Sequence, residues 1–111
     1  MRRPEHIDVL GRRIRIRMRL EKSMPEALGE WHAEHSRIDL RRGQQQHDEA
    51  DTLLHETMHA ILAGQGREYG HAVEEMYVRA LATGLLTVLR ENPAFVAWLT
   101  RPFKAPTKEA P

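Results

Sequence analysis

In the segment RRIRIRMRL, residues 12–20, charged and apolar side chains alternate strictly from residue 13 to residue 20. Successive side chains of a β-strand point to opposite faces, so a period of two predicts a strand with one buried and one solvated face. The side chains expected to point inward are Ile14, Ile16, Met18 and Leu20. The chain must therefore fold around a sheet that buries this aliphatic face.

Two neighbouring segments predict partners for this strand. The run HIDVLG ends at Gly11 and favours a hairpin over about residues 7–20, with its turn near that glycine. The run RIDLRRG, residues 37–43, predicts a third strand, whereas residues 21–36 have no sustained period and predict a loop with one helical turn. The first half is therefore expected to form a small antiparallel sheet of about three strands.

The hydrophobic period changes from two to that of a helix at Gln44. Asp48 is the expected N-cap, and the helix is expected to end at Gly64. The apolar stripe of this helix is Ala50, Leu53, Leu54, Thr57, Met58, Ile61 and Leu62.

Two further helices are predicted beyond it. A long helix is expected over about residues 71–90, and Pro93 marks the start of a short one. The apolar stripe of the long helix is Tyr77, Val78, Leu81, Ala82, Leu85, Val88 and Leu89. Phe95, Trp98 and Phe103 are expected to be core or capping anchors, like Trp31. We therefore predict an α+β fold in which residues 1–100 form a single domain and residues 101–111 a flexible Pro-rich tail.

Composition limits the chemistry available to the chain. With 111 residues there is room for one small domain. The absence of cysteine excludes disulfides and thiolate metal sites, which leaves His, Asp and Glu as the strong ligands. The sequence contains no secretory signal pattern and no apolar run approaching the ~20 residues of a membrane span. We therefore expect a cytoplasmic protein without a membrane partner.

The predicted first helix contains the pattern H-E-x-x-H, formed by His55, Glu56 and His59. Side chains four residues apart share one helix face, so both imidazoles can reach one metal ion at the ~2.0–2.1 Å of a zinc–nitrogen bond. Glu56 then lies beside the ion as a proton acceptor. The simpler alternative is a core helix that carries two half-exposed histidines.

A catalytic zinc ion typically has three protein ligands, so one more is needed. The metzincin continuation requires a histidine six residues after His59, where the chain has Gln65. The next helix offers Glu74 and Glu75 near its start, where a carboxylate on an apolar face is costly unless it is paired or metal-bound. Alternatively, both glutamates favour the helix dipole and have no other role.

The stretch TLLHETMHAIL, followed by the leucine-rich residues 81–86, resembles the zincin domain of ImmA/IrrE-type metallopeptidases and of similar short phage-encoded proteins. The resemblance implies a minimal zincin-like fold. It also implies a third zinc ligand on the second helix, six residues before that leucine-rich stretch, which is Glu75 here. Glu74 is the next candidate, followed by His71 and Glu68.

The predicted function is zinc-dependent cleavage of a protein or peptide substrate. His55, His59 and Glu75 would bind one Zn²⁺ ion, and Glu56 would act as the general base. The strand at 37–43 is a candidate for holding an extended peptide along the cleft. Candidates for a transition-state hydrogen-bond donor, which the sequence does not rank, are Tyr69, Tyr77, His71 and His35.

The sequence also leaves a second functional class open. Residues 1–22 carry eight basic and three acidic side chains, although the net charge of the whole chain is only +1. The alternating arginines could bind nucleic-acid phosphates, which would make the protein a non-catalytic binding or regulatory module. These arginines are Arg13, Arg15, Arg17 and Arg19. A solvated sheet face is the preferred explanation, because no aromatic side chain interleaves these arginines for base stacking.

Overall fold

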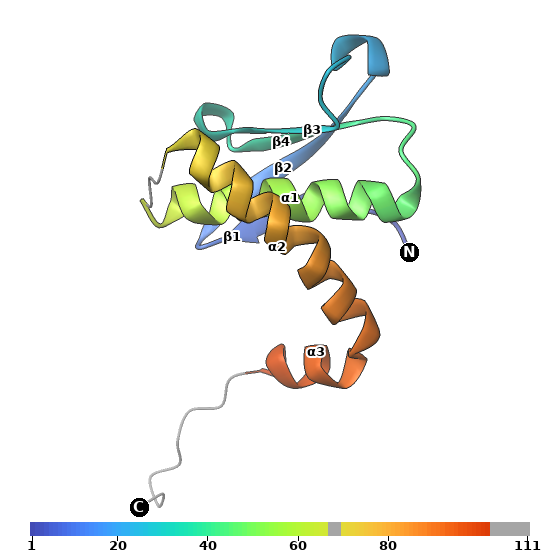
Figure 1. The fold of residues 1–111 in the computed structure, drawn as a ribbon, viewed down its shortest axis with the longest axis vertical. Helices are drawn as coiled ribbons and strands as arrows, with labels where there is room; N and C mark the ends of the chain where they lie inside the picture. The colour runs from blue at the N-terminus through green and yellow to red at the C-terminus, as the bar shows by residue number, and fades with distance from the viewer. Residues whose placement is uncertain (67–69, 103–111) are drawn as a thin grey trace, which may run out of the picture.

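A computed structural model describes residues 1–66 and 70–102 of the chain. The first half forms strands β1 (His6–Val9), β2 (Arg12–Arg19), β3 (Gly29–His32) and β4 (Arg37–Arg41), with short 3₁₀ turns η1 (Glu21–Ser23) and η2 (Ala33–His35). The second half forms helices α1 (Gln46–Gly64), α2 (His71–Glu91) and α3 (Pro93–Leu99). The predicted α+β class is confirmed (Figure 1). Most of the predicted tail, from residue 103 onward, lies outside the described residues.

The sheet has four strands in the order β1-β2-β4-β3 and is mixed. β2 and β4 are parallel, while the two outer pairs are antiparallel. The prediction of about three antiparallel strands was therefore wrong in detail. β3 was missed because it is a four-residue strand in a segment without a sustained period. After β2 the chain first forms β3 at the edge of the sheet and then turns through η2. β4 then lies between β3 and β2 and pairs with both.

The predicted hairpin between β1 and β2 is confirmed, with His6 opposite Arg15 and Val9 opposite Arg12. Its two turn residues, Leu10 and Gly11, have φ angles of 50° and 83°. Positive φ at both central residues matches the right-handed twist of the flanking strands, and glycine adopts it without a steric penalty.

The core lies between one face of the sheet and α1. It consists of Ile14, Ile16, Ile38, Leu40 and Ala60, with Ile7, Val9, Met18, Trp31 and Leu53 packed around them. Two of the residues predicted from the alternation are fully buried. Leu20 is instead exposed because β2 ends one residue before it.

Helix α1 begins earlier than predicted, because its N-cap is Gln45 rather than Asp48. Asp48 and Glu49 lie in the first turn instead. Carboxylates there interact favourably with the helix dipole, which explains why Asp48 resembled a cap in the sequence.

Helix α2 packs on α1, and α3 follows it at the far end of the molecule (Figure 1). Polar contacts between the helices continue to Thr83, whose hydroxyl donates to the carboxylate of Asp51. Only Val78 and Ala82 of α2 are buried, so much of its predicted apolar stripe faces solvent. None of the helices in the described part of the chain has the length and hydropathy that a membrane crossing requires.

Candidate metal centre

The two histidines of the H-E-x-x-H pattern lie one turn apart on α1 and face α2. Their ring centroids are 5.1 Å apart. His59 is buried and His55 is half-buried, because α2 and the sheet cover this part of the helix. A pair of imidazoles in this position has little contact with water and is available to a shared ligand.

Glu75 of α2 joins the two rings. Its Oε1 lies 2.8 Å from Nε2 of His55, and its Oε2 lies 2.9 Å from Nε2 of His59. Donor atoms of the three side chains all lie within 4.8 Å of one another, close enough to hold one metal ion. The structure thus brings together the three residues that the sequence and the family resemblance singled out.

Glu74 contacts the other nitrogen of the buried histidine. Its Oε2 lies 2.5 Å from Nδ1 of His59. Consecutive helical residues point about 100° apart, so the two glutamates approach the ring from different sides. A carboxylate that accepts the Nδ1 proton fixes the tautomer and leaves Nε2 available, which is the usual arrangement behind a metal-binding histidine. Two further candidates for the third ligand were His71 and Glu68. His71 lines the neighbouring cleft, and Glu68 is outside the described residues.

The charge of Glu75 is maintained by its neighbours. Burial raises the pKa of its carboxyl group, but His55 and His59 outweigh that effect and lower the pKa below its ordinary value. Glu75 is therefore an anion at neutral pH, as a metal ligand must be. The guanidinium of Arg79, 3.6 Å away, is largely exposed, so water screens its effect.

Glu56 is placed differently from the other carboxylates. Burial raises the pKa of its carboxyl group, and the nearby His55 and His59 offset only part of the rise. A carboxylate with an elevated pKa in a cleft is suited to accept a proton and then release it.

The cleft beside Glu56 has a volume of about 680 Å³ and lies between β3, α1 and α2. Gly29 allows β3 to approach α1 closely here: a Cβ atom at this position would lie 2.6 Å from Cγ2 of Thr52 and 3.1 Å from Cγ of Glu56. The expectation that the strand at 37–43 runs along the cleft was wrong, because β4 is paired on both sides. β3 is the outer strand, paired with β4 in the described residues.

The four candidates for a transition-state donor are separated by the structure. His71 lines the cleft. Tyr77 instead lines an apolar groove between α1 and α2, and His35 lies exposed on η2 beside Glu34. Tyr69 lies outside the described residues. Among the described candidates, His71 is therefore the one that lines the cleft.

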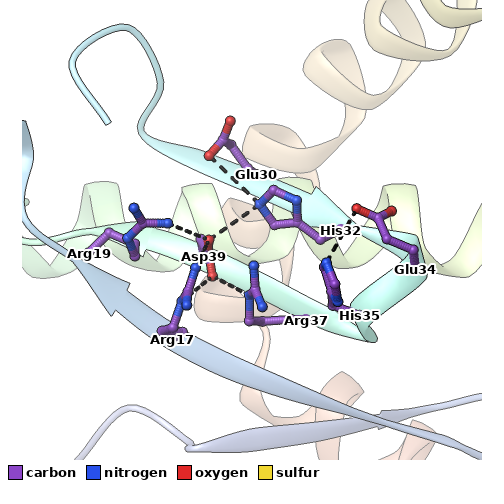
Figure 2. Close-up of polar contacts among 8 residues, drawn as sticks. All are labelled: Arg17, Arg19, Glu30, His32, Glu34, His35, Arg37 and Asp39. Carbon is purple, nitrogen blue, oxygen red and sulfur yellow. Dashed lines mark hydrogen bonds and ion pairs between the residues drawn. The ribbon is translucent and has the colours of Figure 1, made fainter. Parts of the chain in front are cut away.

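Sequence reasoning missed a second polar cluster, on the outer face of the sheet. Glu30, His32 and Asp39 also bring possible metal-binding atoms within 4.8 Å of one another. Figure 2 shows that three guanidinium groups converge on the same aspartate. Arg17 donates to it through Nε and Nη2 at 3.1 and 2.9 Å, Arg37 through Nε at 2.8 Å and Arg19 through Nη1 at 3.2 Å. The strand register that places β2, β3 and β4 side by side was the missing information.

The surroundings of Asp39 oppose the binding of a metal cation. Its side chain is fully buried, which raises its pKa, but Arg17 and Arg37 outweigh burial and hold the pKa below its usual value. Nε2 of His32 lies 3.3 Å from Oδ2 of Asp39, yet its geometry makes no hydrogen bond among the described residues. A cation at this carboxylate would have to displace or approach guanidinium groups of like charge.

Carboxylate partners also neutralise most of the alternating arginines that were proposed to bind nucleic acid. Besides the two that bind Asp39, Arg13 donates to Asp8 at 3.1 Å. The bond to Arg13 lowers the pKa of Asp8. Three of the four alternating arginines therefore carry a carboxylate partner, and Arg15 is the remaining member of the row. Paired guanidiniums offer less charge to a phosphate backbone than isolated ones.

Comparisons of the chain with protein-family models, curated proteins and solved structures gave no match. The functional interpretation therefore depends on the motif and on the site geometry.

Proposed function

We propose that this protein is a zinc-dependent metallopeptidase. In this proposal His55, His59 and Glu75 bind one zinc ion, and Glu56 is the general base. The main support is the position of Glu75, whose two carboxylate oxygens face Nε2 of both histidines at 2.8 and 2.9 Å. Glu75 follows His59 by 16 residues and His55 by 20, and the packing of α2 on α1 brings all three side chains to one point in a partly exposed cleft.

The geometry of the three side chains fits a zinc ion with a small adjustment. Tetrahedral bonds of ~2.0 Å separate neighbouring donor atoms by about 3.3 Å. The donor separations of 2.8 and 2.9 Å are a few tenths of an ångström shorter, which side-chain rotation can supply. Two histidines and one glutamate form a known catalytic zinc set, and this set leaves a fourth position for water or substrate.

A zinc ion held by these residues would supply Lewis acidity and would acidify a water molecule beside Glu56. Glu56, whose pKa is raised by burial, would accept a proton from that water and pass it to the leaving amine. Glu74 holds the His59 ring in the orientation that presents Nε2. The half-buried cleft limits the access of bulk water to these groups.

The outer strand β3 suggests how a substrate binds. Its edge borders the cleft, and β3 is paired with β4 on its inner side. An extended peptide can add to such an edge through backbone hydrogen bonds, which do not depend on the peptide sequence. Gly29 keeps that edge close to Glu56, so a peptide on β3 would pass the proposed general base. The substrate class is therefore an extended or unfolded segment of a protein.

The substitution Glu56→Gln tests the proposal. Glutamine preserves size and hydrogen-bonding capacity but cannot accept the proton, so cleavage of a mixed peptide library should fall by about 10²–10⁴-fold. Mass-spectrometric peptide detection gives the rate, and metal analysis should find one zinc ion per chain in both proteins.

The matched control is Glu26→Gln, which changes a carboxylate that also lines the cleft but is exposed. It should leave the rate unchanged. Cleavage by Glu56→Gln at the wild-type rate would eliminate the peptidase proposal. A wild-type protein that takes up no zinc would do the same.

A further inference from the structure

An apolar stripe on α2 faces solvent rather than the core. Its members are Val73, Tyr77, Leu81, Leu85 and Val88. The spacings of four, four, four and three residues place them on one side of the helix, next to the side that packs on α1. Tyr77 and Leu81 are 59% and 56% exposed, which is unusual for residues at such regular spacing. A contiguous exposed apolar stripe of this kind commonly marks a site of interaction.

The first half of this stripe forms one wall of a groove. Met58, Ile61 and Leu62 of α1 form the opposite wall, and the groove has a volume of about 290 Å³. Among the described residues that line it, Glu74 is the one that carries a charge. This volume is at the lower limit for a small-molecule pocket, and the groove is instead suited to a few side chains from a helix.

A matching helix lies elsewhere in the same chain. α3 has the sequence PAFVAWL, which contains no charged residue. Phe95, Trp98 and Leu99 are exposed at positions i, i+3 and i+4, while Val96 is half-buried. Helices that bind in grooves present their anchor side chains with this spacing. The apolar face of α3 is thus exposed, and the guanidinium of Arg101 lies over its Trp98 ring, 5.2 Å from the ring centroid.

This helix cannot reach the groove of its own chain. Leu81, at one end of the groove, is twelve residues before Pro93, and a helix rises about 1.5 Å per residue, so the separation along α2 is about 18 Å. One residue, Asn92, connects α2 to α3. Figure 1 shows α3 at the far end of α2, away from the end of α1 that contributes to the groove.

We propose that a second copy of this chain supplies the occupant, so that α3 of each copy binds in the α1–α2 groove of the other. The arrangement is reciprocal and closes as a two-fold dimer, because each copy offers both a groove and a helix. The groove, the stripe and α3 together expose nine large apolar side chains per chain, and covering them in both copies provides the apolar centre that an interface of about 800 Å² per partner requires. α3 itself carries no charge, and Arg101 beside Trp98 would lie at the rim of the contact.

Sedimentation equilibrium of the full-length protein tests the dimer at chain concentrations from about 1 to 100 μM, which covers the affinities of weak to moderate complexes. The wild type should be dimeric in this range. Leu81→Glu in the groove and Trp98→Glu on α3 should each give a monomer, because either change places a charge in the apolar contact. The matched control is Met76→Glu, an equally exposed residue on another side of α2, which should remain dimeric.

A mixture of the two monomeric variants gives the sharper test. The Leu81→Glu chain retains its α3, and the Trp98→Glu chain retains its groove, so one of the two contacts can form between them. The mixture should therefore contain a heterodimer. This heterodimer should have a larger dissociation constant than the wild-type dimer, because it keeps one contact instead of two. Direct packing of two α2 helices would give no such rescue and would leave Trp98→Glu dimeric.

The proposal is overturned by a wild type that stays monomeric at 100 μM, by a dimeric Trp98→Glu protein, or by a mixture without heterodimer. Circular dichroism and zinc content, which do not depend on dimerisation, establish that each variant is folded. If Leu81→Glu is not folded, Tyr77→Lys replaces it as the groove variant. A result against the dimer leaves the peptidase proposal untouched, since the metal ligands lie outside the groove and α3.

Discussion

In the described part of the chain, two clusters bring three histidine and acidic side chains together, and they have opposite electrostatic surroundings. At the candidate metal centre, Glu75 faces the two imidazoles of α1. On the outer face of the sheet, Asp39 accepts hydrogen bonds from three guanidinium groups. Ligand-type side chains within 4.8 Å of one another occur in both places.

The comparison shows that proximity of ligand atoms is not sufficient for a metal site. A neutral imidazole leaves the negative charge of a carboxylate available to a cation, whereas a guanidinium, which stays protonated, already neutralises it. The second cluster thus has a permanent counter-charge built in, whereas the imidazole nitrogens of the first can exchange a proton for a metal ion. The first is suited to chemistry and the second to holding three strands in register.

The largest expected difference between the clusters is in metal content. His59→Ala removes a proposed ligand and should reduce zinc from about one ion per chain to none, together with all peptidase activity. His32→Ala, the equivalent change in the outer cluster, should retain the zinc. Metal analysis of both purified proteins measures the zinc content. If His32→Ala lost the zinc and His59→Ala kept it, the zinc site would be the outer cluster.

The two glutamates of α2 should differ in their effect on zinc affinity. Glu75→Ala removes a direct ligand and should weaken binding the most. Glu74→Ala removes only the partner of Nδ1 of His59 and should weaken it by about 10–100-fold. Competition with a chelator gives both dissociation constants. A weaker effect for Glu75→Ala than for Glu74→Ala would make Glu74 the ligand.

The outer cluster should affect stability rather than chemistry. Asp39→Asn leaves three guanidiniums around a neutral amide and should lower the free energy of unfolding by about 2–4 kcal/mol. Urea denaturation of the zinc-free proteins measures this loss. The control is Glu30→Gln, at an exposed position opposite Asp39 in the strand register, which should change the free energy of unfolding by less than about 0.5 kcal/mol. Equal stability of Asp39→Asn and the wild type would show that the network contributes nothing.

The smallest expected effect is the pH dependence of the difference in free energy of unfolding between the wild type and Asp39→Asn. The pKa of Asp39 is lowered in the folded protein, so its contribution is complete above the unfolded-state pKa of about 3.9 and is lost as the pH falls through the folded-state pKa. The stability curves of the wild type and Asp39→Asn should therefore converge below about pH 4. Denaturation at a series of pH values in the zinc-free proteins checks this, and curves that stay parallel would contradict it.

Several elements could be read from the sequence because their determinants are local. Strict alternation over residues 13–20 fixed β2, and helical periodicity with Pro93 gave the three helices. The i, i+4 spacing placed His55 and His59 on one face. Such patterns need no information on distant residues, since strand and helix periods are properties of the backbone.

Other features depended on which segments meet in space. β3 is four residues long and was recognisable only through its pairing with β4. The sequence could not choose between Glu74 and Glu75, because both open the same helix, and only the approach of α2 to α1 shows which of them faces Nε2 of both histidines. Asp39 looked like an ordinary polar residue of a strand until three arginines surrounded it.

The sequence alone thus determined β2, the hairpin and the three helices, and it placed the two histidines and the proposed general base on one helix, because each depends on spacing within one segment. The tertiary structure alone decided which carboxylate faces both histidines, which cluster already has its counter-charge and which apolar stripe remains exposed. These properties arise from distances between segments, and the free energy of a charge or an apolar surface depends on what lies next to it rather than on its place in the chain.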